Sequence, residues 1–210
     1  KMRAIALLER LAIANPAQRA EQYPFEFSGG MLQRAMIAMA VVCEPELLIA
    51  DEPTTALDVT VQAEVLSLLQ EMRESSGTAM LFITHDLGVV AEIADSVSVM
   101  YAGQTVESGS LHDVFSREAH PYTQALKRAV PSLENPKPLE AIAGTPPDLR
   151  QPPSGCGFAA RCSKRMAICE ESPPLMSCGE DHLARCWLWH KDHPERWREA
   201  EAVSLLGGKS

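Results

Sequence analysis

The sequence lacks the features that mark membrane-spanning, secreted or nucleic-acid-binding chains. In its 210 residues, no apolar run approaches the ~20 residues that a transmembrane helix requires. No stretch has the order of a signal peptide. Basic residues are in deficit, because 19 Lys and Arg stand against 28 Asp and Glu, for a net charge of −9. A broad nucleic-acid footprint would require a clustered basic face. The composition therefore predicts a cytosolic globular protein that contacts membranes only through protein partners.

A Ser-Gly-Gly segment stands at the start of a predicted helix. Ser28, Gly29 and Gly30 precede an apolar-periodic stretch, 31–43. The first N–H groups of a helix have no partner within it, and the helix dipole is positive there, so a phosphate can bind at such a start. The same residue types also form plain N-caps. Taken alone, the segment leaves both interpretations open.

Two acids follow a short apolar run. Residues 47–50 are typical of a buried parallel strand, which would deliver Asp51 and Glu52 to its carboxyl end. Binding sites of open α/β sheets lie at that edge. Asp51 is suited to hold Mg²⁺ through water, and Glu52 to accept a proton from an attacking water. An acid pair after a strand is otherwise only solvated.

A histidine ends the next apolar run. Residues 78–83 are followed by Thr84, His85 and Asp86. A lone histidine is usually structural, but this one is expected to share a sheet edge with Glu52. The order and spacing of the three segments together indicate nucleotide chemistry.

Alternating patterns predict an α/β fold with a largely parallel sheet covered by helices on both faces. The predicted helices are 3–14, 29–43, 60–74, 87–94, 110–117 and 121–129, and the predicted strands are 47–51, 79–84, 96–101 and 104–107. A turn at Ala102 and Gly103 joins the last two strands, and Gly109 closes the hairpin. We interpret Met31, Met36 and Met39 as core filling, and Cys43 as a buried, inert thiol.

The composition changes after residue 130. Prolines interrupt 131–155, which has no sustained period and predicts a linker. Residues 156–190 then carry five of the six cysteines in a polar setting, and 191–210 form a tail. The sequence therefore predicts an α/β domain over 1–130 and a small Cys-rich module over 156–190.

Three explanations compete for the clustered cysteines, which are Cys156, Cys162, Cys169, Cys178 and Cys186. A cytosolic setting disfavours disulfides. Incidental thiols are expected in apolar runs rather than among Gly, Ser, Arg and Lys. A bound metal would supply folding energy that the polar segment lacks. However, no C-x-x-C pair is present, so zinc-ribbon spacing is not met, and spacing alone does not decide.

The order of motifs over most of 1–130 resembles the nucleotide-binding subunit of an ATP-binding cassette (ABC) transporter. In that resemblance the Ser-Gly-Gly segment corresponds to the cassette signature, the acid pair to the Walker B motif, and residues 56–58 to the D-loop. It implies that Glu52 is the catalytic base and His85 the switch histidine. The residues that it implies for binding ATP and Mg²⁺ are Ser28, Gly29, Gly30, Gln33, Asp51 and Asp58.

The sequence departs from the family pattern in two ways. Phe27 and Met31 replace the Leu and Gln of the commonest signature, although the Ser-Gly-Gly core is intact. In addition, no G-x-x-x-x-G-K-[ST] phosphate loop occurs, because Val203 stands where Gly208-Lys209-Ser210 would need the first glycine. Without that loop the chain lacks half of its own ATP site. We therefore expect an amino-terminally truncated protein that is inactive alone and binds ATP weakly or not at all.

The carboxy-terminal part resembles the extension of dipeptide and oligopeptide transporter ATPases. The segment 120–126, which begins His-Pro-Tyr, is similar to that subfamily's hallmark, and the cysteines are similar to its cysteine module. The resemblance implies a [4Fe–4S] cluster held by Cys156, Cys162, Cys169 and Cys186. Cys178 is then the surplus thiol, and His182 or His190 could substitute if the metal were Zn²⁺.

The resemblance also implies partners and a place in the cell. Two ATPase subunits, identical or related, would meet head to tail on permease subunits at the cytoplasmic face of a bacterial inner membrane. A substrate-binding protein would deliver dipeptides, oligopeptides, glutathione-like peptides or nickel for import. Alternatives are a soluble ABC ATPase of DNA repair or of ribosomes, and a non-catalytic metal-binding fragment. The sequence lacks the coiled-coil heptads, second cassette and basic tail of such soluble ATPases.

Overall fold

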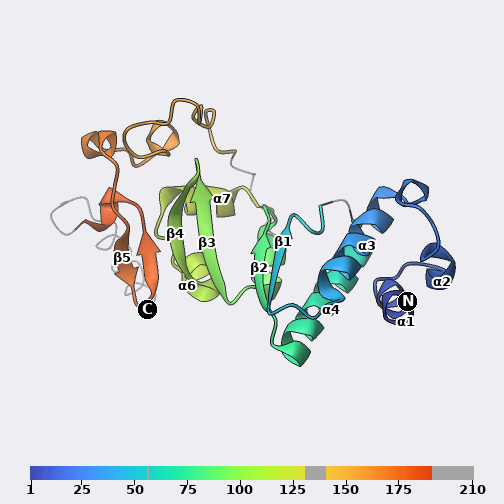
Figure 1. Ribbon diagram of the computed structural model, residues 1–210. Helices are drawn as coiled ribbons and strands as arrows, with labels where there is room; N and C mark the ends of the chain where they lie inside the picture. Colours follow the sequence, from blue (N-terminus) through green and yellow to red (C-terminus); the bar gives the residue numbers. More distant parts are fainter. Residues whose placement is uncertain (56, 131–140, 191–210) are drawn as a thin grey trace, which may run out of the picture. The chain divides into compact units, whose positions relative to one another are not determined.

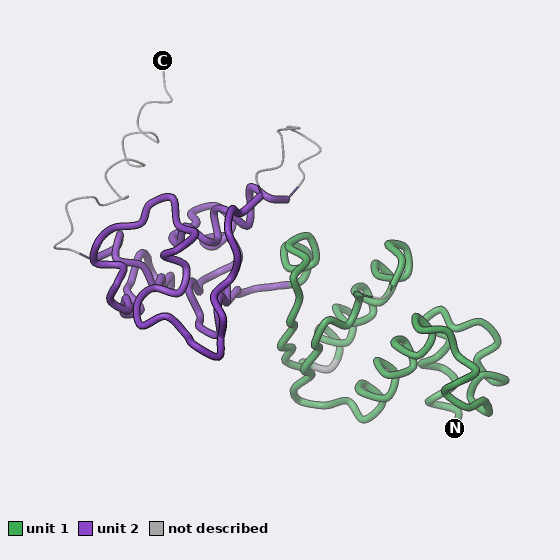
Figure 2. Tube along the Cα trace, turned by 90° about the horizontal axis from the view of Figure 1, so that it is seen from above, with its two compact units in different colours: residues 1–93 green, residues 94–210 purple. Residues whose placement is uncertain are grey.

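The computed structural model describes residues 1–55, 57–130 and 141–190 (Figure 1). The chain forms two compact units, Lys1–Ile93 and Ala94–Ser210 (Figure 2). Among the described helices, none combines the length and apolar character that crossing a bilayer demands. The predicted tail, 191–210, lies outside the described residues, as does much of the predicted linker. The predicted domain boundaries stay predictions.

The first unit combines helices with a two-stranded parallel sheet. Its helices are α1 (Met2–Arg10), α2 (Pro16–Arg19), the 3-10 turn η1 (Pro24–Glu26), α3 (Gly29–Val41), α4 (Val59–Ser76) and α5 (Leu87–Ile93). Its strands are β1 (Leu47–Asp51) and β2 (Ala79–Ile83). The two strands run parallel in a register that sets Asp51 opposite Ile83. Their carboxyl ends therefore meet at one edge, as predicted.

Side chains and backbone freedom fix the ends of the longer helices. Ser28 Oγ accepts the N–H of Met31 at the start of α3, and Asp58 Oδ1 accepts the N–H of Val61 at the start of α4. Helix α4 ends at Gly77, whose φ of 68° is left-handed and favours glycine. These local signals explain why the predicted helix bounds lie within a few residues of those in the structure.

The core of the first unit lies between α1, α3, α4 and one face of the sheet. Leu11, Val41, Val65 and Leu69 are almost fully buried there, with Leu48 from β1. Each such side chain contributes about 2 kcal/mol to folding. The opposite face of the sheet is exposed, at Leu47, Ile49, Leu81 and Ile83.

Four predictions about burial in this unit are wrong. Strand β1 is buried on alternate residues only, because among the described residues helices pack on a single face of the sheet. For the same reason the sheet is not covered on both faces there. Met36 and Met39 are exposed on the side of α3 away from the core, and Cys43, just beyond α3, is exposed as well. Met31 packs against the core as predicted.

The second unit is built on a four-stranded antiparallel sheet in the order β3-β4-β6-β5. Its elements are β3 (Ser96–Tyr101), β4 (Gln104–Ser110), α6 (Leu111–Ser116), α7 (Pro121–Arg128), η2 (Ala159–Arg161), η3 (Ala167–Glu170), β5 (Met176–Gly179), β6 (His182–Ala184) and η4 (Trp187–Trp189). The predicted hairpin is confirmed, with Ala102 and Gly103 both at positive φ in its turn. Strand β4 extends past Gly109, where the hairpin was expected to close.

Strands within the Cys-rich segment were not predicted. Strand β6 pairs with β4, so that Glu107 lies opposite Ala184 and Ser108 opposite Leu183. Phe158, from the loop before η2, packs edge-on against Tyr101 of β3, with ring centroids 5.3 Å apart. The Cys-rich segment and the hairpin therefore share a sheet and a core.

Candidate functional site

Glu52 and His85 meet where β1 and β2 end. His85 Nδ1 lies 2.7 Å from Glu52 Oε1, and Thr55 Oγ1 donates a hydrogen bond of 2.6 Å to Glu52 Oε2. The N–H of Glu52 also donates to the carbonyl of Ile83, at 2.9 Å. The predicted sharing of one sheet edge by Glu52 and His85 is confirmed. Both oxygens of the Glu52 carboxylate have partners.

The electrostatics of this pair favour its charged form. The Thr55 hydroxyl and then the His85 ring lower the pKa of Glu52, because both stabilise the carboxylate. The hydrogen bond and charge of Glu52 raise the pKa of His85. Glu52 has a φ of 48°, a strained value for a residue with a side chain. The chain turns at Glu52, directly after β1 ends at Asp51.

The Gln33 side chain binds the backbone of the same turn. Its Nε2 donates hydrogen bonds to the carbonyls of Glu52 and Pro53, and its Oε1 is buried without a partner. The side chain therefore connects α3 to the backbone of the acid turn. Sequence reasoning had grouped Gln33 with the nucleotide contacts and missed this connection. No sequence signal indicated the direction of the amide.

The start of α3 faces open space. Ser28 and Gly29 are exposed, and a Cβ placed on Gly29 would meet nothing within 4 Å. Because Ser28 Oγ accepts the N–H of Met31, the plain N-cap is realised in the structure. Asp51 is exposed at the last position of β1, while Asp58 caps α4. Ala56, in the predicted D-loop, lies outside the described residues.

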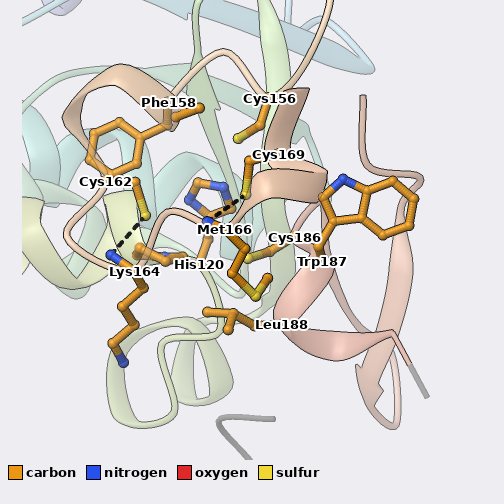
Figure 3. Close-up of a pocket in the computed structure, with 12 residues that line it drawn as sticks. His120, Cys156, Phe158, Cys162, Lys164, Met166, Cys169, Cys186, Trp187 and Leu188 are labelled. Atoms are coloured by element: carbon orange, nitrogen blue, oxygen red, sulfur yellow. Dashed lines mark hydrogen bonds between the residues drawn. The ribbon is translucent and has the colours of Figure 1, made fainter. Parts of the chain in front are cut away.

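Four cysteines line one small pocket in the second unit (Figure 3). They are Cys156, Cys162, Cys169 and Cys186, the four that the sequence resemblance selected. The space between the lining residues is about 10 Å³, close to the room of one water molecule. Within 1–55, 57–130 and 141–190, no three His, Cys, Asp or Glu side chains converge closely enough to hold a metal ion. We call this site the thiol pocket.

Burial favours the protonated form of three thiols of this pocket. It raises the pKa of Cys156 and Cys162, and it raises the pKa of Cys186 to about 12. Backbone N–H groups nevertheless point at two sulfurs, since Lys164 donates to Cys162 Sγ and Met166 to Cys169 Sγ. Any metal that binds here must displace protons from the thiols.

Two family models match separate parts of this chain. Residues 1–55 match the ABC transporter model, and residues 106–169 match the model described as oligopeptide/dipeptide transporter, C-terminal region. Over these two stretches the chain is similar to the peptide-transporter branch of the ABC ATPase family.

Curated relatives in this ABC ATPase branch align with most of the chain. The oligopeptide transport ATP-binding protein OppD of Bacillus subtilis is 51% identical over 198 residues, which are 93% of this chain and 55% of the relative. The probable D,D-dipeptide transport ATP-binding protein DdpD of Escherichia coli is 51% identical over 191 residues, 90% of this chain and 58% of the relative. The chain thus spans little more than half the length of these relatives.

A solved structure described as dimeric MJ0796, a bacterial ABC transporter cassette, is 29% identical to this chain. The match covers 52% of this chain and 46% of the solved one, with a TM-score of 0.48.

The other candidate metal ligands of the Cys-rich segment do not line the thiol pocket. Cys178 Sγ donates to the carbonyl of His182, and the His182 ring binds Glu107. The His190 ring packs on Trp187. Among the described residues, the histidine that lines the thiol pocket is His120, whose pKa burial lowers to about 4. Sequence reasoning noted the His-Pro-Tyr segment only as a hallmark and missed this placement.

Proposed function

We propose that this chain is part of an ATP-hydrolysing subunit that powers import of dipeptides or oligopeptides through a membrane permease. The observation that carries the proposal is the contact of Glu52 with His85 at the shared end of two parallel strands. Similarity to the peptide-transporter branch supports peptides as the cargo.

In the proposed reaction, Glu52 orients a water and takes its proton. Both of its oxygens are engaged, one by His85 and one by Thr55. Each oxygen keeps a second lone pair that can accept that proton. His85 would turn from Glu52 toward the γ-phosphate of bound ATP. Beside Glu52 the pKa of His85 is raised, which favours a charged ring, and the phosphate would replace the carboxylate as the anionic partner of that ring.

Other residues supply charge and contacts around the nucleotide. Asp51 is an exposed carboxylate at the strand end, and its hard oxygen donors fit Mg²⁺. When bound, that ion would neutralise charge on the phosphates. The exposed start of α3, at Ser28, Gly29 and Gly30, would bind the γ-phosphate held by a second ATPase subunit. Asp58 would link the two sites across the interface.

The assembly would be a homodimer or heterodimer of ATPase subunits on the cytoplasmic face of the inner membrane. Permease subunits would anchor it, and a substrate-binding protein would deliver the peptide on the other side. Nucleic acid is not among the proposed partners, since acidic residues outnumber basic ones.

The test is ATP turnover by the whole subunit carrying Glu52→Gln. Removal of the general base should keep ATP binding and lower turnover by about two to four orders of magnitude. Glu46→Gln, which changes an exposed carboxylate just before β1, is the matched control and should hydrolyse ATP normally. Near-normal turnover in Glu52→Gln would overturn the assignment of Glu52.

We further infer that the thiol pocket holds a [4Fe–4S] cluster on Cys156, Cys162, Cys169 and Cys186. Four thiols from two chain segments line one pocket, and Cys178 bonds elsewhere, which supports this donor set. Cys₄ ligation is usual for such clusters. Because the pocket is about 10 Å³, the loops that carry the thiols must separate to admit a cluster. When bound, the cluster would bridge those loops and stabilise the extension.

Measuring the metal and acid-labile sulfide content of the anaerobically purified chain tests this inference. We expect about four iron and four sulfide per chain. Cys162→Ser should lose both, and Cys178→Ser, the matched control, should keep them. Zinc without sulfide would replace the cluster by a structural Zn²⁺, and a metal-free chain would refute a metal at this pocket.

A further inference from the structure

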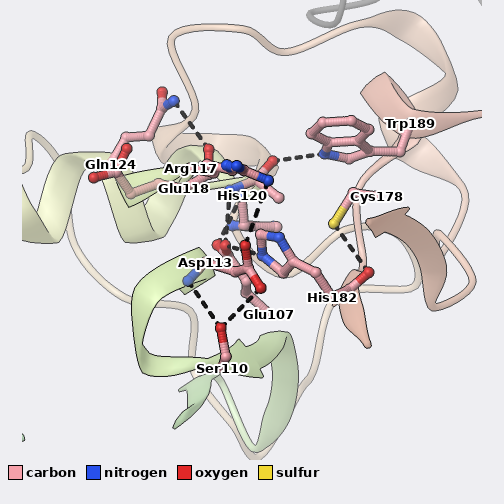
Figure 4. Close-up of polar contacts among 11 residues, drawn as sticks. Glu107, Ser110, Asp113, Arg117, Glu118, His120, Gln124, Cys178, His182 and Trp189 are labelled. Atoms are coloured by element: carbon pink, nitrogen blue, oxygen red, sulfur yellow. Dashed lines mark hydrogen bonds and ion pairs between the residues drawn. The ribbon is translucent and has the colours of Figure 1, made fainter. Parts of the chain in front are cut away.

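A fully buried carboxylate lies beside the thiol pocket. Glu107 of β4 has no exposed surface, and its two oxygens accept three hydrogen bonds (Figure 4). Oε1 accepts from the N–H of Ala119, at 2.7 Å, and lies 2.8 Å from His182 Nε2. Oε2 accepts from the N–H of His120, at 2.9 Å. Burying a carboxylate is unfavourable unless such donors satisfy it, and here each oxygen is satisfied.

The three partners of Glu107 come from two elements that carry the walls of the thiol pocket. His120 begins α7, caps it through Nδ1, which accepts from Tyr122 N–H at 3.0 Å, and lines the pocket. His182, 3% exposed, lies in β6, which leads directly into Cys186. Glu107 thus joins the start of α7 to the strand that brings Cys186 to the pocket.

Close packing around this carboxylate limits its movement. A Cβ on Gly109 would lie 3.0 Å from His182 Cδ2, so a side chain at this position would require the His182 ring to shift. Trp189 Nε1 donates to the carbonyl of Ala119, at 2.8 Å, and holds the loop from the other side. Arg185 N–H donates to the carbonyl of Val106, at 2.8 Å. Cys186 therefore follows a backbone that is tied to β4 on both sides of Glu107.

We propose that Glu107 is a positioning residue for the thiol pocket, holding His120 and the β6 segment so that Cys186 faces the thiols of 156–169. This role concerns the protein residues around the pocket, and it rests on the proposed cluster only for its metal readout. Glu107 would act through its hydrogen bonds and would not touch the metal.

The test compares rates of alkylation at each cysteine in the metal-free chain, measured by mass spectrometry. Cys169 and Cys186 are buried and should react slowly, whereas the exposed Cys43 of the first unit reports the intrinsic rate. Glu107→Gln replaces one acceptor oxygen by an NH₂ group that cannot accept from an N–H. We expect alkylation of Cys186 to accelerate at least about tenfold, because local opening becomes more populated. Cys43 should be unaffected.

Glu170→Gln is the matched control, because Glu170 is an exposed carboxylate of the same segment, paired with Arg165. It should leave all rates unchanged. His182→Gln keeps a donor for Glu107 at a smaller size and serves if Glu107→Gln does not fold. It should expose Cys186 more than Cys156.

The outcomes separate this proposal from the cluster. Accelerated alkylation of Cys186 in a chain that never binds iron supports the positioning role and refutes the cluster alone. Unchanged alkylation of Cys186 in a folded Glu107→Gln or His182→Gln chain overturns the positioning role, whatever the iron content. Equal acceleration at all five cysteines of the second unit would indicate general unfolding and would overturn it as well.

Discussion

At the scale of single residues, several contacts hold the half-buried carboxylate of Glu52 and its backbone. It accepts from Thr55 and pairs with His85, while its backbone is left-handed. Gln33 holds the carbonyls of the same turn. Three residues, Gln33, Thr55 and His85, thus hold the carboxylate or the backbone turn that carries it, although the carboxylate remains open to solvent.

The first prediction concerns the titration of His85. Its pKa should lie above the ordinary value near 6.5, because the Glu52 carboxylate favours the charged ring. The charge pair is complete below the ordinary histidine pKa and is lost as pH rises through the raised one. On the acid side it is lost as pH falls through the lowered pKa of Glu52. NMR titration of the His85 ring measures this.

In Glu52→Gln the pKa of His85 should fall back toward its ordinary value. Glu64→Gln, at an exposed position of α4, should leave the titration of His85 unchanged. A histidine that titrates normally in the unaltered chain would contradict the contact seen in the structure.

A second prediction concerns Gln33. Gln33→Met keeps the length of the side chain but removes both donors from the carbonyls of Glu52 and Pro53. The free energy of unfolding of the first unit should fall by about 1–3 kcal/mol, since partly buried carbonyls lose their partners. Urea denaturation measures the change. Gln18→Met, on the exposed side of α2, is the control and should stay within about 0.5 kcal/mol of the parent.

At the scale of elements, the sequence predicted those whose signals are local. Strands 47–51 and 96–101 match the structure residue for residue, because Pro53 and Gly103 mark where each run stops. The meeting of Glu52 and His85 at one sheet edge was predicted from the parallel pairing of β1 and β2. Strands β5 and β6 escaped prediction, since they are only four and three residues long and depend on distant partners: β6 pairs with β4, and β5 pairs with β6. The burial of β1 depends on which faces of the sheet are covered by helices, and the apolar run 47–50 does not contain that information.

An element-scale prediction concerns the start of α4. Asp58→Ala removes the oxygen that caps the N–H of Val61 and should lower the stability of the first unit by about 1 kcal/mol. Asp58→Asn keeps a capping oxygen and should retain most of that stability. Thermal unfolding of the three proteins decides. Equal losses in both variants would assign the effect to charge rather than to the cap.

At the scale of the whole molecule, the elements that we propose to act on phosphate occur in a sequence without a phosphate loop. The start of α3 and the Glu52–His85 pair supply few of the contacts that hold ATP. We expect the isolated chain to bind ATP with a Kd weaker than about 1 mM, a binding free energy of less than about 4 kcal/mol. Calorimetric titration with MgATP measures this, and ADP serves as the comparison. Micromolar binding would show that the described residues hold the nucleotide themselves.

The uncovered face of the β1–β2 sheet has a consequence for the colloidal behaviour of the chain. Leu47 and Ile49 are 55% and 61% exposed, beside Leu81 and Ile83 on the neighbouring strand. Such an exposed apolar patch favours association between molecules, while the net charge of −9 produces electrostatic repulsion between them. Salt screens the electrostatic repulsion but does not weaken the hydrophobic attraction. The solubility of the chain should therefore drop on adding sodium chloride, and the osmotic second virial coefficient should turn from positive to negative.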